Sequence, residues 1–413
     1  MRDVDLYRQV LGLPEPWTVA RVKLNVREQR VDIWVEWKGR PQWRCPECQA
    51  VVPLYDHELE RAWRHLDTCQ FVTYLHARPP RIDCPAHQVR QVRLPWAEPN
   101  ARFTALFERL AIDVLAECSV KGAAKILRVS WDEAWGIMAR AVARGQLAKK
   151  HRAPRLLGVD EKAVAKGQTY VTIVCDLMAG TVEHVADDAK RSSLDEYYAT
   201  LTAAQRARIE AVAMDMSEAY TQSTIANLPD GATKIVYDRF HLMAHMQKAV
   251  DQVWKRENGL LREDGDASLV GTKVLWRYAA EHLPAKYEAR FVPLLQRPLH
   301  TARAWAIKED LRQTWDYLTE AEARQHLTRW YFWATHCRLK PVIKAARTVH
   351  NHLANILTYF THRITNATAE GLNSKIQTIK QMACGFRNRA HYKTAIFFHC
   401  GGLDFYPATH SNV

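Results

Sequence analysis

Long apolar segments are missing from this sequence. A transmembrane helix needs about 18 consecutive apolar residues, and no window of this sequence contains such a run. The first residues, "MRDVDLYRQVLGLPEP", also lack the apolar core of a signal peptide. We therefore expect neither a membrane-spanning helix nor an export signal. Internal repeats and low-complexity segments are absent too, which excludes repeat architectures.

A disulfide framework is also missing. The chain has nine cysteines, an odd number. Five of them stand apart in apolar or helical surroundings: Cys69, Cys118, Cys175, Cys337 and Cys400. This distribution favours a reducing cytosol over an oxidising compartment.

Carboxylates are scarce near the C-terminus. Between Glu322 and Asp404 the only acid is Glu370, among twelve Lys and Arg. The whole chain of 413 residues carries a formal net charge of +13. Such a charge favours a polyanionic partner, with nucleic acid before membrane. The proportions of 47% hydrophobic and 25% charged residues are typical of a soluble globular protein with two or three domains.

Three zones differ in their residue patterns. Residues 1–98 are rich in Trp, Cys and Pro, and "RVKLNVREQRVDIWVEWKG" alternates as strands do. Residues 100–150 are Ala-rich with a helical period. From Arg155 onward the pattern is mixed α and β, and residues 240–355 are expected to be almost wholly helical.

The third zone begins with three expected strands in an antiparallel meander. "RLLGVDEKAV" predicts a short strand that ends near Asp160, and "QTYVTIVCDLMAGTVEHVAD" predicts two more around a turn at Met178–Gly180. A helix is expected at Ser193–Arg208. Two further strands, in "IEAVAMDMS" and "TKIVYDRFH", end at Asp215 and Asp238.

The isolated Glu370 lies in a predicted helix, Thr365–Met382. One helix face is apolar, and the other carries Glu370, Asn373, Gln377 and Gln381, with Lys380 beside them. Amides and cations suit a phosphate backbone, whereas a carboxylate repels it unless a divalent metal lies between. Glu370 could instead form a surface ion pair with Lys375 or Arg363.

Asp160 and Asp215 favour the metal interpretation. Both follow apolar strands that we expect side by side, and sites form at strand ends in open sheets. With Glu370 they could hold two Mg²⁺ (or Mn²⁺) ions roughly 4 Å apart. Taken alone, each aspartate could equally be a turn or N-cap residue.

The chain resembles a bacterial DDE transposase of the ISL-three type. Four stretches carry the resemblance, in the family's order: "LLGVDEKAV", "AVAMDMSEAY", "IVYDRFHLMAHM" and "ITNATAEGLNSKIQTIKQMACGFRNRAHY". It implies an RNase H-like core with a large α-helical insertion, and Asp160, Asp215 and Glu370 as catalytic metal ligands. Asp238 is an alternative second acid, but it could also be the N-cap of a helix that starts near Phe240.

Two pairs of metal-ligand residues lie near the N-terminus. "CPEC" contains Cys45 and Cys48, and "CPAH" contains Cys84 and His87. Two such knuckles, joined by expected strands, predict a closed tetrahedral zinc site of a structural kind. The family usually has cysteine at the fourth position, so Cys69 is the alternative to His87.

Residues 119–145 predict a helix-turn-helix. A short helix, Val120–Leu127, is followed by a tight turn at Arg128–Ser130 and a second helix from about Trp131. Residues 119–152 carry eight Lys and Arg against two acids. A plain helical hairpin between domains is the alternative. The candidate DNA contacts here are Lys121, Lys125, Arg128 and Arg140.

These features predict the following order along the chain: a zinc-ribbon-like domain at 1–98, a helix-turn-helix domain at 99–152, the first part of an RNase H-like domain at 153–245, the helical insertion at 246–355 and the rest of the catalytic domain at 356–413. The insertion is rich in Trp, which we expect mostly in its core, although some could stack on a displaced DNA base.

The predicted function is a DDE transposase. Residues 1–150 would bind the inverted repeats of its element, and the metal site would cut the 3′ ends and join them to target DNA. Asn373, Lys380, Arg387 and Arg389 would hold the DNA backbone. We expect at least a dimer on DNA, in the bacterial cytoplasm at the nucleoid. The alternatives are a non-enzymatic DNA-binding regulator and an RNase H-like nuclease.

Overall fold

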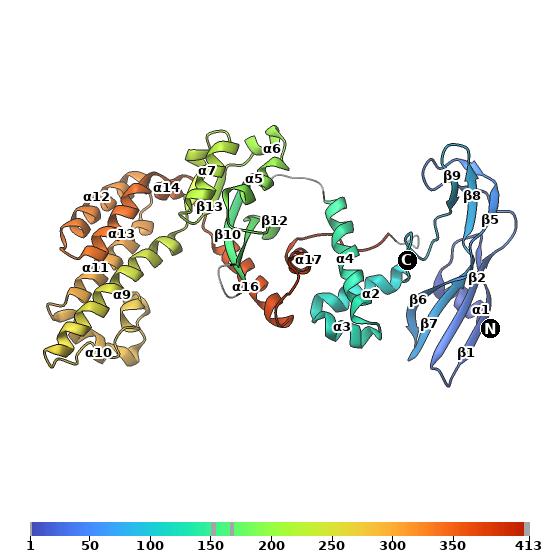
Figure 1. The fold of residues 1–413 in the computed structure, drawn as a ribbon, viewed down its shortest axis with the longest axis horizontal. Coiled ribbons are helices and arrows are strands. Elements are labelled where there is room, and N and C mark those ends of the chain that lie inside the picture. Colours follow the sequence, from blue (N-terminus) through green and yellow to red (C-terminus); the bar gives the residue numbers. More distant parts are fainter. Residues whose placement is uncertain (1, 150–153, 166–168, 409–413) are drawn as a thin grey trace. The chain divides into compact units, whose positions relative to one another are not determined.

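The computed structural model describes residues 2–149, 154–165 and 169–408 (Figure 1). The chain divides into two compact units. One consists of Met1–Lys150 together with Ala390–Val413, and the other of His151–Arg389. Within the described residues, no helix is both long enough and apolar enough to cross a bilayer.

The first unit begins with helix α1 (Asp3–Leu11) and a sheet in the order β1-β2-β7-β6. The alternating segment forms β1 and β2, so the predicted strands are confirmed. Three Trp side chains, Trp17, Trp63 and Trp96, fill the core. The sheet strands are β1 (Trp17–Asn25), β2 (Arg30–Trp37), β6 (Arg61–Thr68) and β7 (Phe71–Ala77).

Two smaller sheets of the first unit carry the Cys and His pairs. Strands β3 (Trp43–Arg44) and β4 (Val51–Val52) form one hairpin. Strands β5 (Leu54–His57), β8 (Pro80–Cys84) and β9 (Gln88–Gln91) form a three-stranded sheet in the order β5-β8-β9.

Three helices follow: α2 (Ala105–Glu117), α3 (Val120–Leu127) and α4 (Trp131–Ala148). The Ser119 hydroxyl caps α3 by accepting a hydrogen bond from the Gly122 N–H at 3.2 Å. Arg128 ends α3 in the left-handed region (φ 56°), and Ser130 with Glu133 forms a capping box for α4. The predicted short helix, tight turn and second helix are therefore confirmed.

The C-terminal helix α17 (Arg389–Cys400) belongs to this three-helix core. Phe398 is only 4% exposed and packs in the same cluster as Phe107 and Ile137. The His391 ring lies 4.3 Å from the Trp135 ring. The sequence pattern predicts 356–413 as part of the catalytic domain, whereas the structure groups the segment from Ala390 with the first unit. Because α17 packs on helices that lie far earlier in the sequence, the residues near α17 do not indicate this contact.

Replacing Phe398 with alanine is expected to loosen the helix-turn-helix. A buried Phe→Ala change costs about 3–5 kcal/mol, so amide hydrogens of α2 to α4 should exchange at least about a hundredfold faster if they open together. Hydrogen exchange of the full chain measures this effect. Leu147→Ala, at a side chain that is 90% exposed on α4, is the control and should change little. Unchanged exchange in Phe398→Ala would mean that α17 is not part of this core.

The second unit contains a five-stranded sheet in the order β12-β11-β10-β13-β14. Strands β10 to β12 are antiparallel, which confirms the predicted meander, and β13 and β14 run parallel to β10. The strands are β10 (Leu156–Ala165), β11 (Thr169–Asp176), β12 (Thr181–Ala186), β13 (Ala211–Met214) and β14 (Ile235–Tyr237).

Two local predictions in this unit are wrong. The first strand does not end near Asp160 but continues to Ala165, because residues 161–163 pair with residues 170–172 of β11. The helix expected at Ser193–Arg208 is two helices, α5 (Arg191–Ala199) and α6 (Ala203–Ala207). Thr202 forms a capping box with Gln205 and so begins a new helix.

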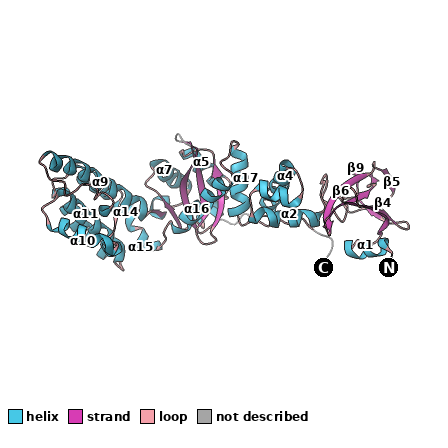
Figure 2. Ribbon diagram, turned by 90° about the horizontal axis from the view of Figure 1, so that it is seen from below, coloured by secondary structure: helices cyan, strands magenta, loops and turns pink. Residues whose placement is uncertain are grey.

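Helices occupy almost all of the chain after β14, as predicted (Figure 2). The 25-residue helix α9 packs against α11 and α13, and α12 packs against α13. Trp276 and Trp330 are fully buried, in agreement with a Trp-rich core. Between β14 and α17 the α-helices are α9 (Arg239–Glu263), α10 (Ala285–Gln296), α11 (His300–Arg312), α12 (Glu320–His336), α13 (Lys340–Asn351), α14 (Leu353–Leu357), α15 (Tyr359–His362) and α16 (Ala367–Met382).

A buried carboxylate joins two of these helices. Glu257 of α9 accepts hydrogen bonds from the His300 and Thr301 N–H groups, both at 2.7 Å. It thereby satisfies free N–H groups at the start of α11 and places a negative charge at the positive end of that helix. This contact helps to fix α11 on α9.

Candidate functional site

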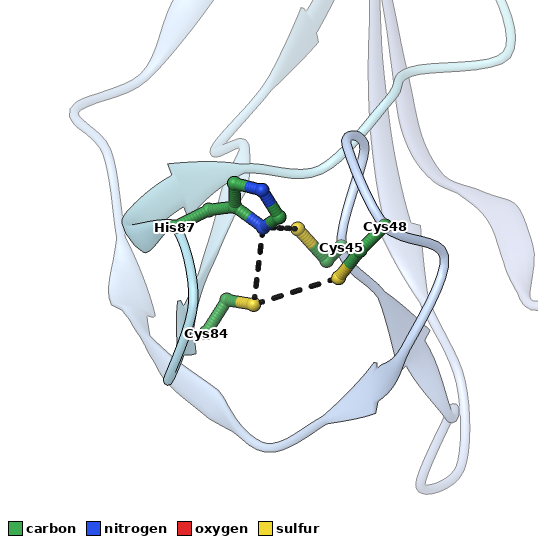
Figure 3. Close-up of side chains that lie close together, drawn as sticks. All are labelled: Cys45, Cys48, Cys84 and His87. Atoms are coloured by element: carbon green, nitrogen blue, oxygen red, sulfur yellow. Dashed lines mark hydrogen bonds between the residues drawn. The ribbon is translucent and has the colours of Figure 1, made fainter.

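The two knuckles of the first unit bring four metal-ligand side chains together (Figure 3). The ligand atoms of Cys45, Cys48, Cys84 and His87 all lie within 4.8 Å of one another. Sγ of Cys48 is 3.7 Å from Sγ of Cys84, and Nδ1 of His87 is 3.6 Å from Sγ of both Cys45 and Cys84. A tetrahedron around zinc with Zn–S bonds of about 2.3 Å has edges of roughly 3.8 Å. The four side chains therefore fit zinc.

The backbone of each knuckle explains how the ligands converge. Gln49 and Gln88, which directly follow the second ligand of each pair, have positive φ values of 62° and 60°. The Cys45 N–H and the Ala50 carbonyl close the first knuckle at 2.9 Å. Cys69 lies in the turn between β6 and β7, exposed and outside the group, so His87 completes the four. The hydrogen bond from His87 lowers the pKa of the Cys84 thiol to about 6, which favours the thiolate that binds metal.

Three aspartates form a row across the parallel strands of the second unit. Gly158 of β10 pairs with Ala213 of β13, and Met214 pairs with Tyr237 of β14. Continuing this register aligns Asp160 with Asp215 and Asp215 with Asp238. Residues in one row of a parallel sheet point to the same face, so the structure brings the two predicted aspartates and their alternative to one place.

The carboxylates in this row share an unfavourable electrostatic environment. Burial raises the pKa values of Asp160, Asp215 and Asp238, and the Asp215 charge adds to the rise at Asp160. Burial also raises the pKa of Glu161, with a contribution from the Asp215 charge. The sequence analysis missed Glu161, although the adjacent acids in "VDEKAV" were a visible signal. A cluster of partly buried acids is a common feature of functional sites.

Asp238 differs from its neighbours in its contacts. It is 6% exposed, and Oδ1 accepts a hydrogen bond from the Phe240 N–H at 3.0 Å, which caps α9. Oδ2 lies 4.0 Å from Nε2 of His241. The structure therefore confirms the N-cap interpretation of Asp238.

Without magnesium, raising the pH is expected to lower the free energy of unfolding of wild type more than that of Asp238→Asn. Because the folded-state pKa of Asp238 is raised, the native state binds its proton more tightly than the unfolded chain does. Its contribution to the free energy of unfolding is therefore largest at low pH and is lost as pH rises through the folded pKa. Asparagine keeps the cap without titrating.

Urea unfolding of both proteins at about pH 5 and pH 8, with zinc but no magnesium, measures this effect. Taking the difference between variant and wild type cancels the titration of the zinc site. Asp238→Asn should gain stability relative to wild type as the pH rises. A difference that is independent of pH would contradict the raised pKa.

Helix α16 runs beside β10 and carries Glu370 on the same helix face as two residues that contact this strand. Nδ2 of Asn373 donates a hydrogen bond to Asp160, and Nζ of Lys380 donates to the Ala163 carbonyl at 3.1 Å. Asn366, Glu370, Asn373 and Lys380 are spaced four, three and seven residues apart, so they share one helix face. Glu370 thus lies one turn before the contact with Asp160. Its side chain is exposed.

The start of α16 fits closely against β10. A Cβ at Gly158 would lie 2.7 Å from Cδ2 of Leu177 and 3.2 Å from Oδ1 of Asn366, so only glycine allows this approach. Asn366 is 1% exposed. This packing fixes the first turn of the helix that carries Glu370. Within the described residues, the ligand atoms of Asp160, Asp215 and Glu370 do not form a group within 4.8 Å, unlike those of the zinc group.

The predicted DNA contacts of the first unit fall into two classes. Lys121 and Lys125 are exposed on α3. Arg128 is ion-paired with Asp67 and donates to the Gln70 carbonyl at 2.7 Å. Arg140 is ion-paired with Glu108, which is only 2% exposed. The two lysines are therefore exposed, whereas the two arginines also form ion pairs within the first unit, and all four stay predicted DNA contacts.

The predicted DNA contacts of the second unit lie on or after α16. Arg387 is exposed, and the Arg389 guanidinium donates to the Asp187 carbonyl at 3.0 Å. Asn373 and Lys380 contact β10, as described above. Asn373 therefore orients a candidate carboxylate rather than presenting its amide to solvent.

Three family models match the chain. The model of the ISL3 DDE domain, described as "Transposase", matches residues 157–396. The helix-turn-helix domain of transposase family ISL3 matches residues 92–142. The zinc finger of the transposases of IS204, IS1001, IS1096 and IS1165 matches residues 41–87.

Two curated relatives extend over most of the chain. The transposase for insertion sequence element IS1557 of Mycobacterium tuberculosis is 25% identical over 443 residues, covering 100% of this chain and 99% of the relative. The transposase for IS1001 of Bordetella parapertussis is 25% identical over 357 residues, covering 84% of this chain and 86% of the relative. The similarity thus includes the zinc group, the helix-turn-helix and the aspartate row.

Proposed function

Because the chain belongs to the ISL3 family of bacterial insertion-sequence transposases, we propose that it cuts the 3′ ends of its element and joins them to target DNA. The observation that carries this proposal is the alignment of Asp160 with Asp215, together with the Asn373 contact that holds the helix of Glu370 beside Asp160. A zinc site, a helix-turn-helix and a DDE domain in one chain fit a DNA-binding transposase.

The catalytic domain is proposed to be an RNase H-like core. The antiparallel meander followed by two parallel strands supports this assignment. The helices between Asp238 and α16 would be an insertion between the second and third acids. We propose the functional domains 1–98, 99–152, 153–245, 246–355 and 356–413, with α17 contributing to the core of the helix-turn-helix.

Asp160, Asp215 and Glu370 are the proposed ligands of two Mg²⁺ ions. Asp160 lies inside β10 and Asp215 lies just after β13, in one row on adjacent strands. A few carboxylates, completed by waters and phosphate oxygens, are the donor set that Mg²⁺ prefers. When bound, the ions would supply an activated water or 3′-OH and stabilise the leaving oxygen. Asn373 would hold the carboxylate of Asp160 in one orientation. Burial of the two aspartates would exclude bulk water from their side of the site.

Cations near the proposed metal site and on the helix-turn-helix would position the DNA. Lys380 and Arg387, on α16 and just after it, would contact the backbone near the scissile phosphate. Lys121 and Lys125 of α3 would contact the element end, and α4 would enter the major groove. Cys45, Cys48, Cys84 and His87 would hold the structural zinc that stabilises the N-terminal domain. Pairing of two ends would require at least a dimer.

A cleavage and joining assay on labelled element-end DNA tests this function. We expect nicks at the 3′ ends and joined products that depend on Mg²⁺ or Mn²⁺ and on the terminal inverted repeat. A duplex of the same composition with a scrambled repeat is the control substrate. Cutting without joining would favour a nuclease, and repeat-specific binding without cutting would favour a regulator.

A further inference from the structure

Charge is unevenly distributed within the helical region of the second unit. Residues 239–322 contain twelve carboxylates and thirteen Lys and Arg. Residues 323–369 contain seven Lys and Arg and no carboxylate. The acid-free segment includes most of α12 and all of α13. Arg324 is ion-paired with Glu320, just before this segment, whereas Lys340, Lys344 and Arg347 form no ion pair with the described residues and can attract a polyanion.

Helix α13 presents its cations to solvent. Lys340, Lys344 and Arg347 are exposed and are spaced four and three residues apart, so they share one face. The opposite face of α13 is buried and consists of Val342, Ala345, Ala346 and Val349. The packing of the apolar face therefore fixes the direction in which the cations point.

Helix α12 exposes aromatic rings to solvent. Phe332 is 65% exposed and Trp333 is 40% exposed. The His336 ring stacks on Phe332 with centroids 4.1 Å apart. Arg329 is exposed one turn earlier on the same side. Trp330, by contrast, is 1% exposed and its ring N–H donates to the Ile307 carbonyl at 2.8 Å, which fixes the rotation of α12.

We propose that this hairpin surface binds single-stranded DNA. The proposed binding residues are Arg329, Phe332, Trp333 and His336 of α12 and Lys340, Lys344 and Arg347 of α13, all of which are exposed. Cations alone can bind the phosphates of any DNA. Exposed aromatic rings add affinity only where the faces of the bases are accessible, as in unpaired strands. A duplex hides its base faces by stacking. The inference rests on the proposed function, in which cut element ends would present unpaired bases to the protein.

Binding of a fluorescent 20-nucleotide single strand, and of the matching duplex, by the full-length zinc-loaded chain tests the proposal. The double variant F332A/W333A should lose at least about fivefold affinity for the single strand, since base–aromatic stacking is worth roughly that much per base. Its affinity for the duplex should stay within about twofold. The control L260A/V292A removes exposed apolar groups from α9 and α10 and should change neither affinity. Circular dichroism verifies that all variants fold.

A charge series tests the cationic half of the surface. Lys340→Gln, Lys344→Gln and Arg347→Gln together should make the salt dependence of single-strand binding shallower by about two, since each phosphate contact contributes roughly 0.7 to the slope. Lys255→Gln, Arg256→Gln and Arg262→Gln on α9 are the matched control, because these cations are also exposed but lie among acids.

Wild-type single-strand affinity in F332A/W333A would overturn the proposal, as would an equal loss for single strand and duplex. The assay contains no element end and no magnesium. A chain that cuts element ends but shows one of these results would refute the surface and leave the proposed function standing. If F332A/W333A loses single-strand affinity as expected but the wild-type chain never cuts element ends, the single-strand site would stand and the proposed function would be refuted.

Discussion

Asp160→Asn and Asp215→Asn are each expected to abolish Mg²⁺-dependent cleavage of element ends. Metal ions contribute several kcal/mol to such reactions, and each 1.4 kcal/mol is about tenfold in rate, so we expect a loss of about a thousandfold or more. The two aspartates stand in one row on adjacent parallel strands. Single-turnover cleavage of labelled end DNA measures the loss.

Asp238→Asn is the matched control, because Asp238 stands in the same row. Its Oδ1 caps α9, and asparagine is an equally good cap. We expect this variant to keep cleavage within about tenfold of wild type. Electrophoretic mobility shifts should show unchanged end binding in all three variants. If Asp238→Asn were inactive and Asp215→Asn active, Asp238 would be the second acid of the site.

Loss of zinc should unfold the N-terminal domain and remove specific binding of element ends. Structural zinc contributes about 10–16 kcal/mol in small zinc domains, more than such a domain can replace by other contacts. Cys45 and Cys84 are buried within the group. Cys84→Ser should therefore bind no zinc and lose affinity for element ends by about a hundredfold or more, since non-specific binding is at least that much weaker.

Zinc content by atomic absorption and end binding by mobility shift measure this prediction. Cys69→Ser is the control, since Cys69 is exposed and outside the group. It should retain one zinc per chain and wild-type affinity. One zinc per chain in Cys84→Ser, or zinc loss in Cys69→Ser, would contradict the assigned ligand set.

Local chemistry made several features predictable. Caps and turns specify α3 and α4, because Ser119, Arg128 and Ser130 each supply a terminus within a few residues. The zinc group was predictable because both knuckles keep their ligands three residues apart. Asp215 and Asp238 were found because each follows a short apolar strand, whereas Asp160 follows an apolar run but lies inside β10.

Features that depend on distant contacts were not predictable. Strand β10 extends past Asp160 only because β11 is there to pair with it. Nothing near Phe398 indicates that its helix completes a core formed by residues almost 300 positions earlier. Arg128 and Arg140 are predicted DNA contacts, and the sequence did not indicate that they also form ion pairs with Asp67 and Glu108. Charge counts along a chain do not reveal such pairs.

We propose that Glu370 completes a metal site with Asp160 and Asp215, and metal rescue distinguishes a metal ligand from a surface charge. Glu370→Gln should fail to cut element ends in Mg²⁺ while still binding them. Glu370→Cys should be inactive in Mg²⁺ but regain activity in Mn²⁺, because thiolate is a poor ligand for Mg²⁺ and a better one for softer metals. Glu370→Ala should stay inactive in both. Wild-type cleavage by Glu370→Gln in Mg²⁺ would show that this isolated acid is only a surface charge.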